Sequence, residues 1–132
     1  PMNFFNGMLE QREDGLWFVE PQLSTKLTDG QAERMNDYAG KNIVFGIRPE
    51  ELTDISEDAS GWDGPRFSAT VEVVEPMGAE AFVYLNTGAN AFVARLETHE
   101  HAVPGQPLAL GLSMEQAHFF EPTPGGDGPA LT

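Results

Sequence analysis

Hydrophobic and polar positions alternate along this chain in short stretches, which Gly and Pro interrupt. The clearest stretch is 67–75, where Phe67, Ala69, Val71 and Val73 fall on one face and the polar residues between them on the other. A period of two predicts a strand that is buried on one side. Because the 14 glycines and 10 prolines leave only brief apolar runs between them, the chain is predicted to be all-β.

Tight turns connect the predicted strands. Gly15 lies between the apolar stretches 8–12 and 16–20, which indicates a hairpin with positive φ at the glycine. The segment 76–78 is expected to form a turn or bulge, and 86–90 a second turn. The other strands are expected at 42–47, 67–75, 80–85, 91–96, 108–112 and 118–120. About eight or nine short strands favour a small Greek-key, OB-like barrel or sandwich, with at most one or two short helices.

One segment, 28–38, is compatible with a short helix. Thr28 or Asp29 could cap its N-terminus, and Gly40 is placed to end it. Its apolar content is thin, so a loop remains the alternative reading of this segment.

The acidic segment 53–65, rich in Gly and Ser, is expected to be an exposed loop between two halves of the sequence. The halves, at about 1–52 and 66–121, are predicted to form two intertwined β modules of one region. The segment 122–132 is rich in Pro and Gly and is expected to be a disordered tail.

Acidic residues dominate the charge of the chain. Lys and Arg total 7 against 21 Asp and Glu, which gives a formal net charge of −14 and a pI of about 4.3. Such a surface repels phosphate backbones and anionic lipid headgroups, so neither nucleic-acid binding nor membrane insertion is expected. No apolar run approaches the ~20 residues that cross a bilayer.

The cellular setting follows from what the sequence lacks. There is no cysteine, which excludes disulfides and thiolate chemistry and fits a reducing compartment. The chain starts at Pro1 without the basic region of a signal peptide. We therefore expect a cytoplasmic piece of a larger protein.

Motifs of common enzymes are missing from the sequence. The glycines at 125–128 precede no predicted helix, and neither Gly-Lys-Ser/Thr nor Gly-x-Ser-x-Gly occurs. We expect no catalytic, cofactor-binding or metal-binding residue, and no enzymatic activity of this chain by itself.

Two groups of residues come close to a metal motif. His99 and His101 flank Glu100 and would share a face on a strand, but no third ligand has a recognisable spacing, so an exposed loop is favoured. The carboxylates of Glu57-Asp58 and Asp63 could bind calcium weakly, yet their spacing matches no EF-hand, and a solvated acidic loop is favoured.

Single residues of interest also carry simple alternatives. Arg48 could form a salt bridge with Glu50, pair with a partner carboxylate, or bind an anion. Trp17 alternates within a strand and is expected in the core, whereas Trp62, in a polar loop, is the better of the two candidates for a binding aromatic residue. His118 is expected to be a partly buried structural histidine.

Four segments, in this order and spacing, resemble one family. They are Pro-Met-Asn-Phe-Phe-x-Gly at 1–7, Phe-Gly-Ile-Arg-Pro-Glu-x-Leu at 45–52, Val-Val-Glu-Pro-Met-Gly-Ala-Glu-Ala-Phe-Val-Tyr at 73–84 and His-Phe-Phe-Glu at 118–121. The chain is similar over nearly 1–121 to the C-terminal regulatory region, an OB-like module plus a TOBE domain, of maltose/glycerol-3-phosphate-type ABC importer ATPases. Pro76 and the loop before Pro65 depart from the family pattern.

The resemblance implies a protein larger than this chain. Its ATPase domain, which would use ATP and Mg²⁺, would power import of a sugar, polyol or glycerol phosphate. The present region would contact its own ATPase domain, a second copy of the chain in a homodimer and, indirectly, the membrane subunits. The protein would be peripheral to the inner face of the cell membrane.

The family signatures also supply the candidate residues. They are Arg48, Pro49, Glu50, Glu75, Gly78 and Glu80. The first three are expected to fix the strand-to-turn geometry and the packing between the two modules, or else to contact the ATPase domain. The glycine is expected to allow a bend, and Glu75 and Glu80 to make structural hydrogen bonds.

Two other functions stay open at this point. Related TOBE domains bind oxyanions such as molybdate, so the chain could be a sensor of oxyanions or sugar phosphates if Arg48, Arg66 or Arg95 were focused on one pocket. An OB-fold binder of single-stranded nucleic acid would show salt-sensitive binding, which the net charge opposes.

Overall fold

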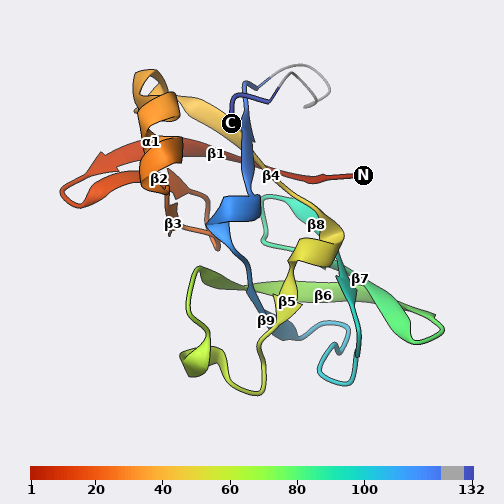
Figure 1. Ribbon diagram of the computed structural model, residues 1–132. Coiled ribbons are helices and arrows are strands. Elements are labelled where there is room, and N and C mark those ends of the chain that lie inside the picture. Colours follow the sequence, from red (N-terminus) through yellow and green to blue (C-terminus); the bar gives the residue numbers. More distant parts are fainter. Residues whose placement is uncertain (123–129) are drawn as a thin grey trace.

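The computed structural model describes residues 1–122 and 130–132, which fold into two antiparallel sheets of five strands each (Figure 1). The strands are β1 (Asn3–Arg12), β2 (Gly15–Val19), β3 (Thr25–Lys26), β4 (Asn42–Ile47), β5 (Thr53–Asp54), β6 (Arg66–Met77), β7 (Glu80–Asn86), β8 (Ala91–Leu96), β9 (Pro107–Gly111) and β10 (His118–Phe120). The helical elements are α1 (Asp29–Met35) and the 3₁₀ turns η1 (Asn36–Tyr38), η2 (Pro49–Glu51), η3 (Ala59–Gly61) and η4 (Met114–Gln116). The predicted all-β, OB-like fold is confirmed.

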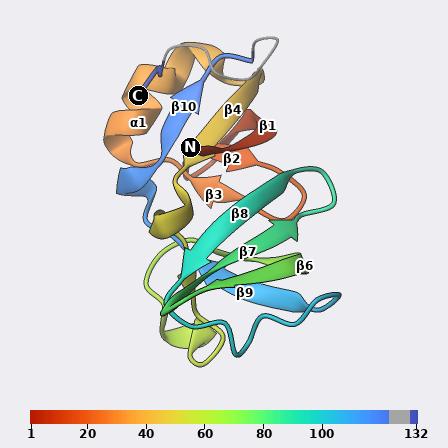
Figure 2. The ribbon, with the colours of Figure 1, turned by 90° about the vertical axis from the view of Figure 1, so that its right-hand side faces the viewer.

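The strand order brings segments from both ends of the chain into one sheet. One sheet has the order β10-β4-β1-β2-β3 and the other β5-β9-β6-β7-β8. β10 follows the whole second sheet in sequence, yet it pairs with β4 of the first, with Phe119 opposite Phe45. Figure 2 shows β10 beside β4 in the half of the molecule that also holds α1. The chain therefore completes the second sheet before it returns to the first.

Most predicted elements are present. The hairpin around Gly15 forms as expected, with Leu16 opposite Gln11 and φ of 140° at the glycine. The ten strands found in 1–122 and 130–132 exceed the expected eight or nine because β3 and β5 have only two residues each, too few to leave a periodic pattern. Within the described residues, no helix is long and apolar enough to cross a membrane.

The helix at 28–38 is also confirmed and continues as a 3₁₀ turn. Thr28 caps it, because its hydroxyl accepts a hydrogen bond from the amide of Gln31 at 3.2 Å while Gln31 Oε1 accepts from the Thr28 amide at 3.0 Å. The Gln31 side chain also donates to the carbonyl of Met114 at 2.6 Å. This bond fastens the helix to the segment that leads into β10.

A continuous apolar core joins the two sheets. Phe5 of β1 is fully buried and contacts Phe67 and Phe92 of the second sheet, with ring centroids 6.2 Å and 4.9 Å away. On its other side Phe5 contacts Phe45, which stacks on Phe18 at 5.1 Å. The buried faces of both sheets thus form one cluster.

The expected burial of Trp17 is wrong. Leu16 and Phe18 point into the core, so the residue between them lies half-buried on the opposite face of β2. There its indole N–H donates to Asp14 at 2.8 Å, and the guanidinium of Arg12 lies 4.5 Å from the ring centroid.

The end of the chain differs in part from the expected disordered tail at 122–132. Residues 123–129 lie outside the described residues. After them, Ala130 forms a β-bridge with Phe120, and the Leu131 amide donates to the Phe119 carbonyl at 2.6 Å. The carbonyl of Thr132 lies 3.0 Å from Nδ1 of His118, which fits the structural role expected for this histidine.

Side-chain amides connect the two sheets where no backbone ladder does. The Asn3 amide group donates to the Val93 carbonyl at 2.7 Å and accepts from the Val93 N–H at 3.0 Å. In the same way, Asn90 accepts from the Asn6 N–H at 2.9 Å and donates to the Asn6 carbonyl at 3.2 Å. Each asparagine side chain therefore forms the two hydrogen bonds that a backbone peptide group would form in a ladder between β1 and β8.

A buried carboxylate completes this amide seam, which we define as Asn3, Asn6, Glu20, Thr87 and Asn90. Glu20 is only 3% exposed, and its Oε2 accepts from Asn90 Nδ2 at 2.7 Å and from the Thr87 hydroxyl. Its Oε1 accepts from the backbone amides of residues 22 and 23. Buried polar groups are stabilising only when all of them are paired, and every buried side-chain N or O atom of the described residues has a partner.

Asn90→Ala is expected to lower the free energy of unfolding by about 1–3 kcal/mol, because it leaves the Asn6 N–H and carbonyl without their side-chain partner and removes one of the two donors to Glu20 Oε2. Urea unfolding followed by circular dichroism measures the change. Asn42→Ala, at an exposed asparagine, is the control and should stay within about 0.5 kcal/mol of the unsubstituted chain. Equal losses in the two variants would contradict the role of the seam.

Candidate functional site

The first family signature, residues 48–50, connects β4 to η2. Pro49 is buried at the first position of the 3₁₀ turn, where its fixed φ suits the turn and no amide is needed. The Arg48 amide donates to Glu51 Oε1 at 2.8 Å and so closes the turn. η2 packs on β8, so this signature holds the end of one sheet against the edge of the other.

The Arg48 side chain itself is exposed. Among the described residues it forms no ion pair, so the expected salt bridge with Glu50 is not observed. Its side chain is therefore exposed to solvent.

The second signature lies at the tip of the β6–β7 hairpin. Gly78 has φ of 71°, in the left-handed region, and forms the turn with Ala79 after Met77 pairs with Glu80. The bulge in this hairpin is not at 76–78 but between Val71 and Val73, where the register with β7 shifts. The bulge turns Val73 outward, so its predicted place on the buried face with Phe67 is wrong, and Val74 packs against the core instead. Glu75 is exposed on the strand opposite Phe82.

Arg95 of β8 pairs with Glu80 of the second signature and lines the same groove as Glu50 of the first. Its Nε donates to Glu80 Oε2 at 2.8 Å, and its NH2 group donates to Oε1 of the same carboxylate at 3.3 Å. The hydrogen bonds that Arg95 donates to Glu80, the charge of Glu80 and the nearby charge of Glu50 raise the pKa of Arg95. We call Glu50, Glu80 and Arg95 the charge bridge.

The charge bridge borders a shallow surface groove. The groove has a volume of about 290 Å³, and Glu50, Asp54 and Arg95 are among the residues that line it. A carboxylate-lined groove of this size next to a paired arginine suits a polar contact with protein better than it suits a buried organic ligand. Sequence reasoning selected Glu50 and Glu80 by family pattern but did not connect them through Arg95.

A second hydrogen-bonded pair of side chains lies beside the groove. His101 Nδ1 is 3.0 Å from Asp54 Oδ2, and the hydrogen bond with this carboxylate raises the pKa of His101. Burial alone would raise the pKa of Asp54, but hydrogen bonds from Ser56 and His101 together lower it. The predicted loop around His99 and His101 is present, and only His101 is drawn into this network.

The other acidic and aromatic candidates serve local structure. Asp58 caps η3 by accepting from the Gly61 amide at 3.0 Å. Trp62 is half-buried, donates to the Pro65 carbonyl at 3.0 Å and covers Gly111, where a Cβ atom would lie 2.5 Å from the indole ring. Trp62 thus seals the end of β9.

The three arginines considered for an anion pocket are placed separately. Arg95 is bound to Glu80, and Arg66 donates to the carbonyl of Ala59. The exposed Arg48 side chain follows β4 of the first sheet. Each of the three guanidinium groups therefore lies in a different local environment.

Two family models match this chain, one after the other along the sequence. The MalK OB fold domain matches residues 1–52, and the TOBE domain matches residues 45–120. The chain is 33% identical over 129 residues to the trehalose/maltose import ATP-binding protein MalK of Thermococcus litoralis, covering 95% of this chain and 34% of that protein. It is 30% identical over 122 residues to the multiple sugar-binding transport ATP-binding protein MsmK of Streptococcus mutans, covering 91% and 32%.

Two further comparisons fit this picture. The sn-glycerol-3-phosphate import ATP-binding protein UgpC of Cupriavidus necator is 34% identical over 91 residues, covering 69% of this chain and 24% of that protein. The solved structure of the cytoplasmic molybdate-binding protein ModG has a TM-score of 0.67 at 19% identity and covers 91% of this chain and 96% of that one. The ModG likeness shows the fold alone. The chain spans about one third of the length of MalK and MsmK.

The charge bridge is expected to stabilise the fold only above acidic pH. The hydrogen bond that Glu80 accepts from Arg95 lowers the pKa of Glu80 below the usual 4.5. The stabilisation is therefore present at neutral pH and is lost as the pH falls through this lowered pKa. Urea unfolding of the unsubstituted chain and of Arg95→Gln should therefore differ at neutral pH and converge in acid. A difference that grows toward acid pH would contradict this assignment.

Proposed function

The chain belongs to the TOBE domain family, with a MalK OB fold domain preceding the TOBE domain, and we propose that it is the regulatory and dimerisation domain of the ATP-binding subunit of an ABC importer. The cargo in this proposal is a sugar, a polyol or a glycerol phosphate. The ATPase activity, with ATP and Mg²⁺, belongs to another domain of the same protein. The subunit is cytoplasmic and docks on membrane subunits at the inner face of the cell membrane.

One observation carries the proposal. Both domain models match in sequence and together span residues 1–120, and the relatives compared over most of the chain are ATP-binding proteins of importers. The structure supports it physically, because both modules share one core and β10 returns to the first sheet. Because two sheets packed around one core move together as a rigid body, a contact made at one sheet can change the position of the other.

The surface for a second copy is the outer face of the β6–β7 hairpin. Val73 and Met77 are 54% and 53% exposed, and Tyr84, directly opposite Val73, is 40% exposed. Exposed apolar side chains that gather on one strand pair mark an interaction site more often than scattered ones do. A twofold axis through this face would bury it against itself.

The net charge shapes this dimer. Two copies with a formal charge of −14 each repel at long range, so apolar contact has to supply the attraction. Salt screens that repulsion, and the dimer should therefore tighten as ionic strength rises.

Arg48 is the proposed contact toward the ATPase domain. Its side chain is exposed while its backbone is fixed by the bond to Glu51, so a guanidinium is presented from a rigid turn. A carboxylate of the ATPase domain is the complementary partner.

Tyr84→Glu and Val73→Glu are expected to convert a dimer to a monomer, because each places a charge in the apolar patch. Light scattering at several protein concentrations measures the mass, and circular dichroism checks that the fold is kept. Gln11→Glu adds the same charge at an exposed site on the first sheet and should leave the dimer intact. A monomer for the unsubstituted chain at every concentration and salt would overturn the dimerisation proposal.

The importer assignment is tested by the coding sequence upstream of Pro1. A Gly-x-x-x-x-Gly-Lys-Ser/Thr loop followed by an ABC signature is expected there in frame. Absence of both would contradict the proposal.

Calorimetric titration with molybdate, sulfate and glycerol phosphate addresses the oxyanion alternative. No binding is expected, because the chain is strongly acidic and Arg66 and Arg95 are engaged apart from each other. Micromolar binding of one of these anions would make the chain a ligand sensor instead.

A further inference from the structure

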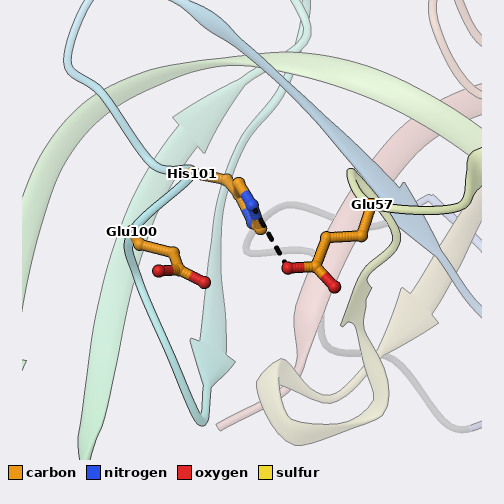
Figure 3. A group of neighbouring side chains, drawn as sticks. All are labelled: Glu57, Glu100 and His101. Carbon is orange, nitrogen blue, oxygen red and sulfur yellow. Dashed lines mark ion pairs between the residues drawn. The ribbon is translucent and has the colours of Figure 1, made fainter.

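Two loops that are far apart in sequence bring metal-binding side chains together. Glu57 precedes η3, whereas Glu100 and His101 lie in the loop between β8 and β9. One ligand atom from each of the three lies within 4.8 Å of the other two. Figure 3 shows the His101 ring and the Glu57 carboxylate directed toward each other, with Glu100 on the other side of the ring.

Asp54 fixes the His101 ring in an orientation suited to a metal. Asp54 Oδ2 lies 3.0 Å from Nδ1, and its other oxygen accepts from the Ser56 amide at 2.9 Å. Its side chain is only 9% exposed, so the carboxylate is held by its surroundings. With Nδ1–H donated to Asp54, the Nε2 lone pair of the neutral ring faces Glu57 at 3.8 Å. Histidine ligands of metal sites are commonly oriented by a carboxylate in this way.

We propose that His101 Nε2, Glu57 and Glu100 form a binding site for Zn²⁺, with Asp54 as the positioning residue. An imidazole nitrogen and carboxylate oxygens suit Zn²⁺, whereas Mg²⁺ and Ca²⁺ prefer all-oxygen sites. Three protein ligands leave the fourth tetrahedral position for water. This site is independent of the proposed importer function.

The geometry requires only a small closure. Zn²⁺ binds nitrogen and oxygen ligands at about 2.0–2.2 Å, which places two ligand atoms of a tetrahedral site about 3.3 Å apart. His101 Nε2 and Glu57 Oε1 are 3.8 Å apart, and the Glu57 side chain is 79% exposed. The longer separations, up to 4.8 Å, involve exposed glutamates that can change rotamer at little cost.

The site differs from the one that the sequence indicated. A metal bound by His99 and His101 would have needed a strand, but this segment is a loop. The ligand that joins His101 is instead Glu57, which lies 44 positions upstream of it. Binding would tie the segment after β5 to the β8–β9 loop. A hollow of about 310 Å³, lined in part by Asp54, Glu57 and His101, lies at this junction.

Isothermal titration of the tag-free, chelator-treated chain with ZnCl₂ tests the proposal, with MgCl₂ and CaCl₂ titrated in parallel. One Zn²⁺ per chain with micromolar or tighter affinity is expected. Glu57→Gln and His101→Asn should each weaken binding by more than about tenfold, and Asp54→Asn by about tenfold, as for outer-shell partners elsewhere. His99→Gln, a neighbouring exposed histidine, is the matched control and should change the affinity less than twofold.

A second readout keeps the test independent of stability. On Zn²⁺ addition, the imidazole resonances of His101 should shift and those of His118 should not. Absence of binding, binding at several weak sites, equal loss in His99→Gln, or unchanged affinity in both Glu57→Gln and His101→Asn would each overturn the site. Preference for Ca²⁺ or Mg²⁺ over Zn²⁺ would also overturn it.

Discussion

The architecture depends on how the central strand of one sheet, β1, meets the edge strand of the other, β8, without a backbone ladder. β1 and β8 approach each other, and the side-chain amides of Asn3 and Asn90 pair with backbone groups of Val93 and Asn6 across the gap. Glu20 binds Asn90 and Thr87 beneath this contact while its other oxygen holds the turn that follows β2. Because an unpaired buried polar group is costly, this seam fixes one relative position of the sheets.

Several other features follow from that fixed position. Phe5 can pack on rings of both sheets only when β1 lies against β8, so the apolar core is continuous. η2 then lies on β8, which brings Glu50 near Arg95 and its partner Glu80. The same arrangement leaves the outer face of β6 and β7 free, where Val73 and Tyr84 are exposed.

Local features of the fold were predictable from the sequence, whereas contacts between distant segments were not. Alternation revealed 67–75 as a strand, and Gly15 and Thr28 marked a turn and a helix start, because each acts within a few residues. Trp17 was misplaced because a residue between two core positions of a strand points the other way.

The sites were less predictable than the fold. Asn3 and Asn90 look like ordinary polar residues until β1 and β8 are adjacent. The family pattern singled out Glu50 and Glu80, but their link through Arg95 needs strand register. Glu57 and His101 lie 44 positions apart, so no local spacing could connect them.

The central claim is that the amide seam makes one cooperative unit of two sheets. Native-state hydrogen exchange measures this directly, by comparing the opening free energies of backbone amides in β4 and in β7 across increasing denaturant. The account predicts that both sets merge into the same global unfolding. Opening of β6–β8 at a clearly lower free energy, while β1 and β4 stay protected, would contradict it.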